Sequence, residues 1–115
     1  MPFLSLQTSV PLTPSQREEL LPPLSRLVAE CIGKPEQYVM VTISDAAIRM
    51  AGAPGPAVYV DVRSIGGLSR AVNRQLSEQM GALLQERLGI PPERLYLGFT
   101  SVSAENWGWN GTTFG

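Results

Sequence analysis

The hydrophobic pattern of the chain recurs at an offset of 56 residues, which limits the folds open to it. The segment from Phe3 to Thr8 aligns with the segment from Tyr59 to Ser64, and polar and apolar residues match position by position. Two later pairs keep the offset: Gly33-Lys34-Pro35 with Gly89-Ile90-Pro91, and Val39-Met40-Val41 with Leu95-Tyr96-Leu97. The pattern predicts one domain over residues 1–115, built from two similar units, residues 1–56 and 57–115.

The first unit reads as strand, helix, strand. β-favouring residues predict a strand from Phe3 to Thr8 and another from Val39 to Ser44. A helix is predicted from Pro14 to Ile32, with Thr13 and Gln16 as a capping box and Gly33 as the residue that ends it. Pro22 and Pro23 fall inside this helix and remove two backbone donors, so we expect a kink there or a helix that starts near Pro22.

The second unit has the same order. A strand is predicted from Ala57 to Ser64 and another from Leu95 to Val102. Between them, apolar residues at spacings of three and four predict a long helix: Leu68, Val72, Leu76, Met80, Leu83, Leu84 and Leu88. Gly89 and Pro91-Pro92 end that helix. Short additional strands are predicted at 48–50 and 107–110.

Two βαβ units with right-handed crossovers predict an α+β fold. The two units join into a four-stranded mixed sheet, with two antiparallel helices on one face. The other face is left uncovered, and we expect Val58, Val60, Val62 or their alternates to make it apolar. A bare apolar face favours burial against further copies of the chain.

Composition excludes several classes of site. The chain has no histidine, which excludes Ser–His and Cys–His pairs and histidine-based zinc sites. The single cysteine, Cys31, lies in an apolar helical pattern and is predicted to be a buried thiol. A net charge of −1 gives no reason to expect nucleic acid or a membrane as partner. Neither a signal peptide nor a membrane span is recognised, so we expect a cytoplasmic protein.

Motifs along nearly the whole chain resemble the macrophage migration inhibitory factor family of the tautomerase superfamily. The resemblance rests on these segments: Met1-Pro2, Thr8 to Pro11, Gly33-Lys34-Pro35, Gln37-Tyr38, Ser64-Ile65-Gly66, Asn73-Arg74, Leu83-Leu84, Glu86-Arg87-Leu88, Asn106, Gly108-Trp109-Asn110 and Thr113-Phe114. It implies a homotrimer whose three sheets form a central barrel, with active sites at the subunit interfaces.

The resemblance also implies an isomerase of the phenylpyruvate tautomerase or dopachrome isomerase type. Pro2, exposed once Met1 is removed, would be the catalytic base, with no metal or cofactor. Lys34 and the backbone N–H of Ile65 would bind the substrate. From the residues alone, Pro2 could equally be a proline that starts a strand, Lys34 a cation at a helix end, and Ile65 a packing residue.

Further residues would complete the pocket. The resemblance implies that Tyr96 enters from the neighbouring subunit, while Tyr38, Val39, Trp109 and Phe114 form an apolar wall suited to an aryl pyruvate. Taken alone, each of these five is equally compatible with core or interface packing.

Departures from the family pattern leave other functions open. Gly98 stands where many members have Asn, and Trp107 where a small apolar residue is usual. Ala57 and Val60 stand where some animal relatives have a Cys-x-x-Cys motif. Their presence excludes thiol chemistry that depends on that motif. The alternatives are a cytokine-like signalling protein with a weak or vestigial site, another reaction on an unsaturated acid, or a structural trimer. For the first, the resemblance leaves open a receptor and secretion without a signal peptide.

Overall fold

The structure, a computed structural model, describes all 115 residues. Four strands form one mixed sheet in the order β2-β1-β3-β4. Their bounds are β1 Pro2–Thr8, β2 Met40–Asp45, β3 Val58–Ser64 and β4 Leu95–Ser101. β1 runs parallel to β2 and antiparallel to β3, and β3 runs parallel to β4. The sheet predicted from two βαβ units is therefore confirmed.

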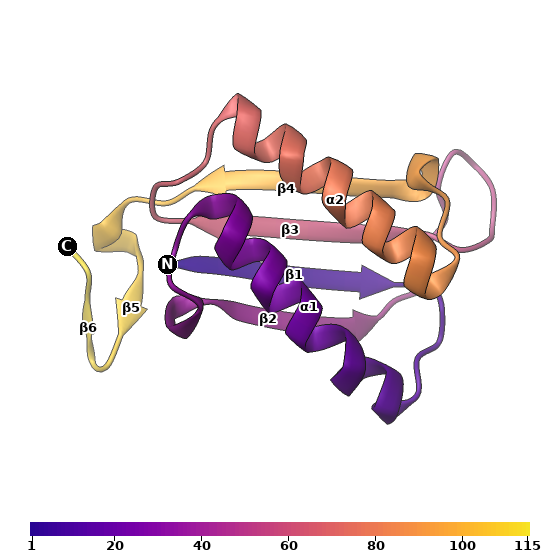
Figure 1. Cartoon of the computed structure of the whole chain (residues 1–115), viewed down its shortest axis with the longest axis horizontal. Helices are drawn as coiled ribbons and strands as arrows, with labels where there is room; N and C mark the ends of the chain where they lie inside the picture. The colour runs from indigo at the N-terminus through magenta and orange to yellow at the C-terminus, as the bar shows by residue number, and fades with distance from the viewer.

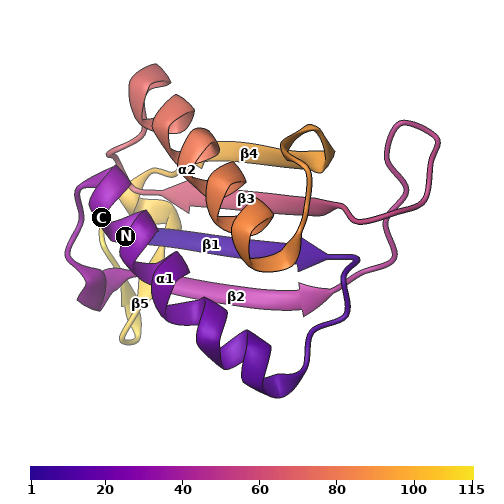
Figure 2. The ribbon, with the colours of Figure 1, turned by 45° about the vertical axis from the view of Figure 1, so that its right-hand side comes forward.

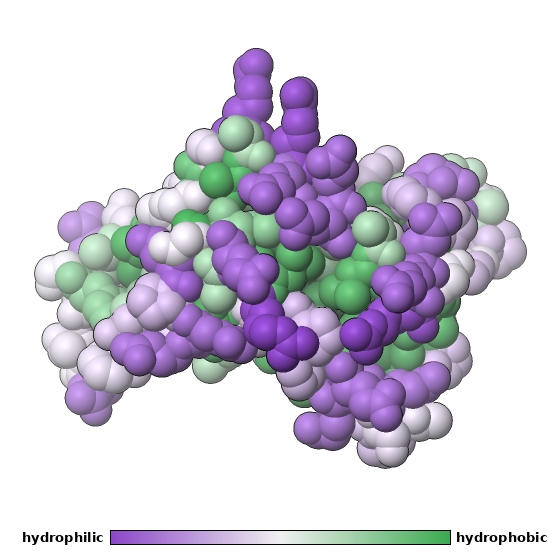
Figure 3. All heavy atoms as spheres, viewed as in Figure 1, coloured by the Kyte–Doolittle hydropathy of each residue, from purple (hydrophilic) through white to green (hydrophobic).

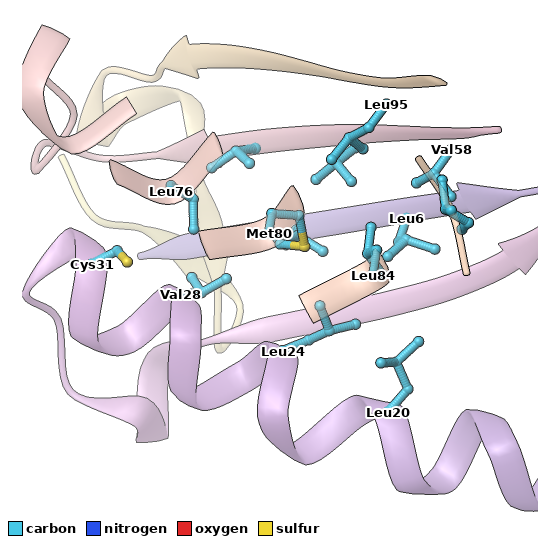
Figure 4. Packing of buried hydrophobic residues seen from close by; sticks show 14 of the residues in the cluster. Leu6, Leu20, Leu24, Val28, Cys31, Val58, Leu76, Met80, Leu84 and Leu95 are labelled. Carbon is cyan, nitrogen blue, oxygen red and sulfur yellow. The ribbon is translucent and has the colours of Figure 1, made fainter. Parts of the chain in front are cut away.

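Two helices cover one face of this sheet and run antiparallel to each other (Figures 1 and 2). They are α1 Pro14–Ile32 and α2 Arg70–Leu88. Leu24 and Val28 of α1 meet Met80 and Leu84 of α2 and the inward side chains of the strands (Figure 4). From outside, apolar residues show between polar ones along the helices (Figure 3). No helix combines the length and the hydrophobicity needed to cross a membrane.

The predicted ends of α1 are confirmed. The backbone N–H of Gln16 donates to the Thr13 hydroxyl at 3.2 Å, and that of Thr13 to the Gln16 side chain at 2.8 Å. Gly33 ends the helix with a φ of 75°. The alternative of a helix that begins near Pro22 is wrong, because α1 runs through both prolines. Those prolines cannot donate to the carbonyls of Glu18 and Glu19, two exposed residues whose carbonyls water can satisfy.

Short elements complete the chain. Three 3₁₀ turns, η1 Glu36–Tyr38, η2 Pro92–Arg94 and η3 Ala104–Asn106, precede strands. β5 Gly108–Trp109 pairs with β6 Thr112–Thr113 in a small hairpin, which confirms a strand within 107–110. The strand predicted at 48–50 is wrong: only an isolated bridge between Met50 and Ala53 forms there.

The uncovered face of the sheet is mostly polar, so the prediction of an apolar face is wrong. Val58, Val60 and Val62 point toward the helices and are buried. Their alternates and the matching positions of the other strands make up the open face: Phe3, Ser5, Gln7, Met40, Thr42, Ser44, Tyr59, Asp61, Arg63, Tyr96, Gly98 and Thr100. The large apolar or aromatic members, Phe3, Met40, Tyr59 and Tyr96, lie toward the ends of their strands rather than across the middle of the face.

Cys31 is buried, as predicted. Its Sγ lies 3.6 Å from Oε1 of Gln79 on α2. Burial, and then the nearby Glu30 carboxylate, raise the pKa of the Cys31 thiol above its ordinary value. The thiol is therefore kept protonated, which disfavours nucleophilic chemistry.

Candidate active site

Pro2 lies at the start of β1, deep in the fold. Its side chain is fully buried, and it pairs across the sheet with Ser64, the last residue of β3. The Ser64 hydroxyl donates to the carbonyl of Gly66 at 2.7 Å and so holds the turn that follows β3. The N-terminal end of β1 and the turn after β3 are thereby fixed side by side.

A hollow of about 240 Å³ opens beside Pro2. Its lining comes from the N-terminus and β1, from η1 through the first residue of β2, and from the C-terminal segment: Met1, Pro2, Phe3, Gln37, Tyr38, Val39, Met40, Trp107, Gly108, Trp109 and Phe114. Figures 1 and 2 both place the C-terminal segment next to the start of β1. Five residues singled out in the sequence, Pro2, Tyr38, Val39, Trp109 and Phe114, thus surround one cavity.

The aromatic wall of the hollow is built by the C-terminal hairpin. Asn110 and Gly111 have φ values of 51° and 80° and form its turn, which lets Gly108 and Trp109 pair back on Thr113 and Thr112. The rings of Trp109 and Phe114 stack with their centroids 5.8 Å apart and 13° between their planes. Stacked rings of this kind favour a flat, apolar guest.

Lys34 and Ile65 converge on the N-terminus of the chain. The backbone N–H of Ile65 donates to the carbonyl of Met1 at 3.3 Å. Burial, and then the positive charge of Lys34, lower the pKa of the Met1 amine below its ordinary value. Lys34 follows the C-cap of α1 and passes over the turn at Gly66 and Gly67. The polar groups that face the N-terminus are therefore a cation and a backbone donor, which can hold a carboxylate or a carbonyl. Neither Lys34 nor Ile65 lines the hollow itself.

The turn at Gly66 and Gly67 leads to a prediction about the stability of the fold. Both glycines have positive φ, but a Cβ on Gly67 would lie 2.6 Å from Cγ2 of Ile32, whereas one on Gly66 would lie 3.8 Å from Nζ of Lys34. We expect Gly67→Ala to lower the free energy of unfolding by about 2–3 kcal/mol, from overpacking added to backbone strain. The matched Gly66→Ala should lose about 1 kcal/mol, from strain alone. Denaturant unfolding of both variants checks this, and equal losses would contradict it.

Tyr96 does not line this hollow. It lies on β4 opposite Tyr59, which in turn lies opposite Gln7, five residues along β1 from Pro2. At the rise of an extended strand, this places Tyr96 roughly 16 Å from Pro2 along the sheet. Its side chain is 66% exposed in the single chain. Tyr96 therefore lies outside the group of residues around Pro2 of its own chain.

Several lining residues were not singled out in the sequence as binding residues. Phe3, Gln37 and Met40 also line the hollow, and each is next in sequence to a predicted site residue. That proximity was the only indication in the sequence that they belong to the site. Trp107 was noted only as a departure, and it borders a second hollow of about 400 Å³ on the open face of the sheet. Phe3, Trp107 and Gly108 line both hollows, so the two spaces adjoin. Sequence spacing gave no sign of this second space, because its lining comes from β1, β3 and the C-terminal segment.

Comparison with known proteins assigns the family. The family model described as "Macrophage migration inhibitory factor (MIF)" matches residues 1–115. The chain belongs to the macrophage migration inhibitory factor family. Membership of this family, which lies in the tautomerase superfamily, confirms the resemblance seen in the sequence.

Relatives in this MIF family match over almost their full length. Macrophage migration inhibitory factor of Meriones unguiculatus is 37% identical over 115 residues, which is 99% of each chain. Among solved structures, the homologue from Prochlorococcus marinus is 40% identical with a TM-score of 0.92, covering 98% of this chain and 99% of that one. The protein from Toxoplasma gondii is 33% identical with a TM-score of 0.93, covering 97% and 99%.

Proposed function

We propose that this protein is a keto–enol tautomerase that acts on phenylpyruvate-like 2-oxo acids, with the amine of Pro2 as catalytic base. The observation that carries the proposal is the meeting of three groups at the start of β1: buried Pro2, the cation Lys34 and the N–H of Ile65, beside an aromatic hollow. A substrate ring would fill the hollow, and its carboxylate would be held by Lys34 and Ile65.

The amine becomes available when Met1 is removed. A terminal amine has an ordinary pKa near 8, so only about a tenth of it is unprotonated at pH 7. The Met1 amine already has a lowered pKa through burial and Lys34. Pro2 lies deeper than Met1, so we infer that its pKa, too, is lowered once it is the terminus. Removal of Met1 also frees the N–H of Ile65, which the Met1 carbonyl otherwise occupies.

The reaction is a 1,3-proton shift without change of oxidation state. In the keto-to-enol direction, the unprotonated Pro2 amine takes a proton from the carbon next to the carbonyl, the C–H electron pair forms the new C=C bond, and the C=O π pair moves onto oxygen. The protonated amine then gives its proton to that oxygen and is regenerated. The reverse direction follows the same steps and returns a proton to carbon. Lys34 and the Ile65 N–H stabilise the negative charge that develops on oxygen.

The proposed active unit is a homotrimer. Tyr96 lies too far from Pro2 of its own chain to take part there, but it is exposed beside the edge of the sheet that β4 forms. A neighbouring copy placed against that edge would bring its own hollow to Tyr96. Each site would then combine Pro2, Lys34 and Ile65 of one subunit with Tyr96 of the next.

The test is an enol–keto assay with phenylpyruvate on protein shown by mass spectrometry to begin at Pro2. We expect interconversion well above the rate in buffer, and a trimer by light scattering. An inactive preparation with Pro2 exposed would refute the proposal.

The pH dependence of the assay should follow the lowered amine pKa. Because only the unprotonated amine accepts a proton, activity should rise with pH through that lowered pKa and reach its plateau at a lower pH than an ordinary terminal amine would allow. Lys34→Gln removes a positive charge that disfavours the protonated amine, so the pKa of the amine should rise. The rising part of the pH–activity profile, its acid limb, should then move to higher pH. Loss of a charged hydrogen bond should also raise KM about 10-fold.

A matched control uses a cation away from the site. Arg26 lies exposed on α1, and Arg26→Gln should change neither the position of the acid limb of the pH–activity profile nor KM. A limb that stays in place in Lys34→Gln would show that Lys34 does not act on the amine.

A second candidate function is cytokine-like signalling, which the names of the relatives favour. In that case the pocket would be incidental to the biological effect. Comparing Pro2→Gly with the unchanged protein in a migration assay separates the two: an effect that survives the loss of turnover supports signalling, and an effect lost with it supports the enzyme.

A further inference from the structure

Tyr59 and Gly98 form a matched pair on the open face of the sheet. Tyr59 lies on β3 and Gly98 on the neighbouring strand β4, two residues beyond Tyr96, the residue directly opposite Tyr59. The ring of Tyr59 leans along the strand until its hydroxyl covers Gly98. A Cβ added to Gly98 would lie 2.5 Å from the Tyr59 hydroxyl oxygen, but 3.6 Å from the ring carbon that carries it. A side chain at position 98 would therefore have to displace the hydroxyl, and the hydroxyl alone.

The phenol of Tyr59 thus fills the space that a side chain at position 98 would take. Position 98 follows Tyr96 by two residues, so both project from the same face of β4. Tyr59 itself lies directly opposite Tyr96. Tyr59 on the inner strand β3 and Tyr96 on the edge strand β4 are 42% and 66% exposed in the single chain, so both phenols are open to solvent on this face.

Neither phenol is tied up within its own chain. The side-chain hydrogen bond on this part of the face joins Nε of Arg63 to Asp61 at 3.1 Å and leaves both tyrosines out. A phenol can donate one hydrogen bond and accept others. Two such groups, one of them with its hydroxyl over a glycine, suit recognition of a polar substituent.

We propose that Tyr59 is a specificity-determining residue, whose hydroxyl binds the ring end of the substrate together with Tyr96 of the same subunit. This inference rests on the proposed function, in which Tyr96 enters the hollow of a neighbouring copy. The carboxylate end is already matched by the cation Lys34 and the Ile65 N–H. Neutral phenols suit a hydroxyl at the opposite end of the substrate, so Tyr59 should favour 4-hydroxyphenylpyruvate over phenylpyruvate.

The decisive variant is Tyr59→Phe, which keeps the ring over Gly98 and removes only the hydroxyl. We expect KM for 4-hydroxyphenylpyruvate to rise about 5-fold, the effect of one neutral hydrogen bond, with kcat unchanged. KM for phenylpyruvate, which lacks the ring hydroxyl, should change less than about 2-fold on the same reasoning. The thermal midpoint and the trimer should stay as in the unchanged protein.

A double-mutant cycle tests the geometry separately from the function. Gly98→Ala alone should repeat the loss of discrimination with little change in the thermal midpoint, because its Cβ would displace the hydroxyl, which is the free end of an exposed side chain. In the Tyr59→Phe background the same change should have no further effect on the ratio of the two KM values, because the remaining carbon contact is of ordinary length.

The outcomes separate the two proposals. Unchanged protein that does not turn over phenylpyruvate with Pro2 exposed would refute the proposed function. Active protein in which Tyr59→Phe leaves the ratio of the two KM values unchanged would refute the role of Tyr59 alone.

Discussion

Protein that keeps Met1 is expected to interconvert the enol and keto forms of phenylpyruvate at least about 100-fold more slowly than protein that begins at Pro2. With Met1 attached, the nitrogen of Pro2 belongs to a peptide bond and has no basic lone pair. The Met1 carbonyl accepts the Ile65 N–H, and Met1 lines the hollow, so substrate binding is obstructed as well.

The two forms can be compared directly. One preparation is made with methionine removal completed and the other with removal inhibited, and each N-terminus is verified by mass spectrometry. Their thermal midpoints should be similar, since Pro2 pairs with Ser64 in either form. Equal turnover by the two forms would exclude the Pro2 amine as base.

Leu24→Ala is expected to lower the free energy of unfolding by about 2–5 kcal/mol. Leu24 is fully buried where α1 crosses the sheet, in the cluster that contains Met80 and Leu84 of α2 (Figure 4). Truncation removes apolar contacts with both layers and leaves a cavity that helices held by a rigid sheet cannot close.

Leu21→Ala is the control, in the same helix and with the same chemical change. Leu21 is only partly buried, so its loss should be smaller. Denaturant titration at fixed protein concentration measures both. Equal losses would mean that burial in the single chain does not govern the stability of α1.

The elements of the fold were predictable because their signals are local. The ends of α1 were predicted correctly, since Thr13, Gln16 and Gly33 act within a few residues of the ends they set. β2 begins one residue later than predicted because Val39 belongs to the end of η1. The polarity of the open face was misjudged although the alternation of Val60 and Val62 with Asp61 and Arg63 was visible.

The site was less accessible to reasoning from residues alone. Pro2, Tyr38 and Phe114 are brought together by long-range packing of the C-terminal hairpin on β1, which no local pattern encodes. Their selection depended on the resemblance to a family. The fit of Tyr59 over Gly98 had no sequence signal, because it depends on the register of two strands and on the direction in which one ring leans.

The hydrophilic character of the uncovered sheet face has a consequence for how copies of this chain hold together. Three such faces turned inward would enclose a channel filled with water, so burial of the sheet faces would add little to the free energy of association. The association would have to depend on contacts between strand edges and on the aromatic residues toward the ends of the strands. Dilution should then separate the copies while each remains folded, and catalysis should fade at concentrations where circular dichroism still reports intact helices.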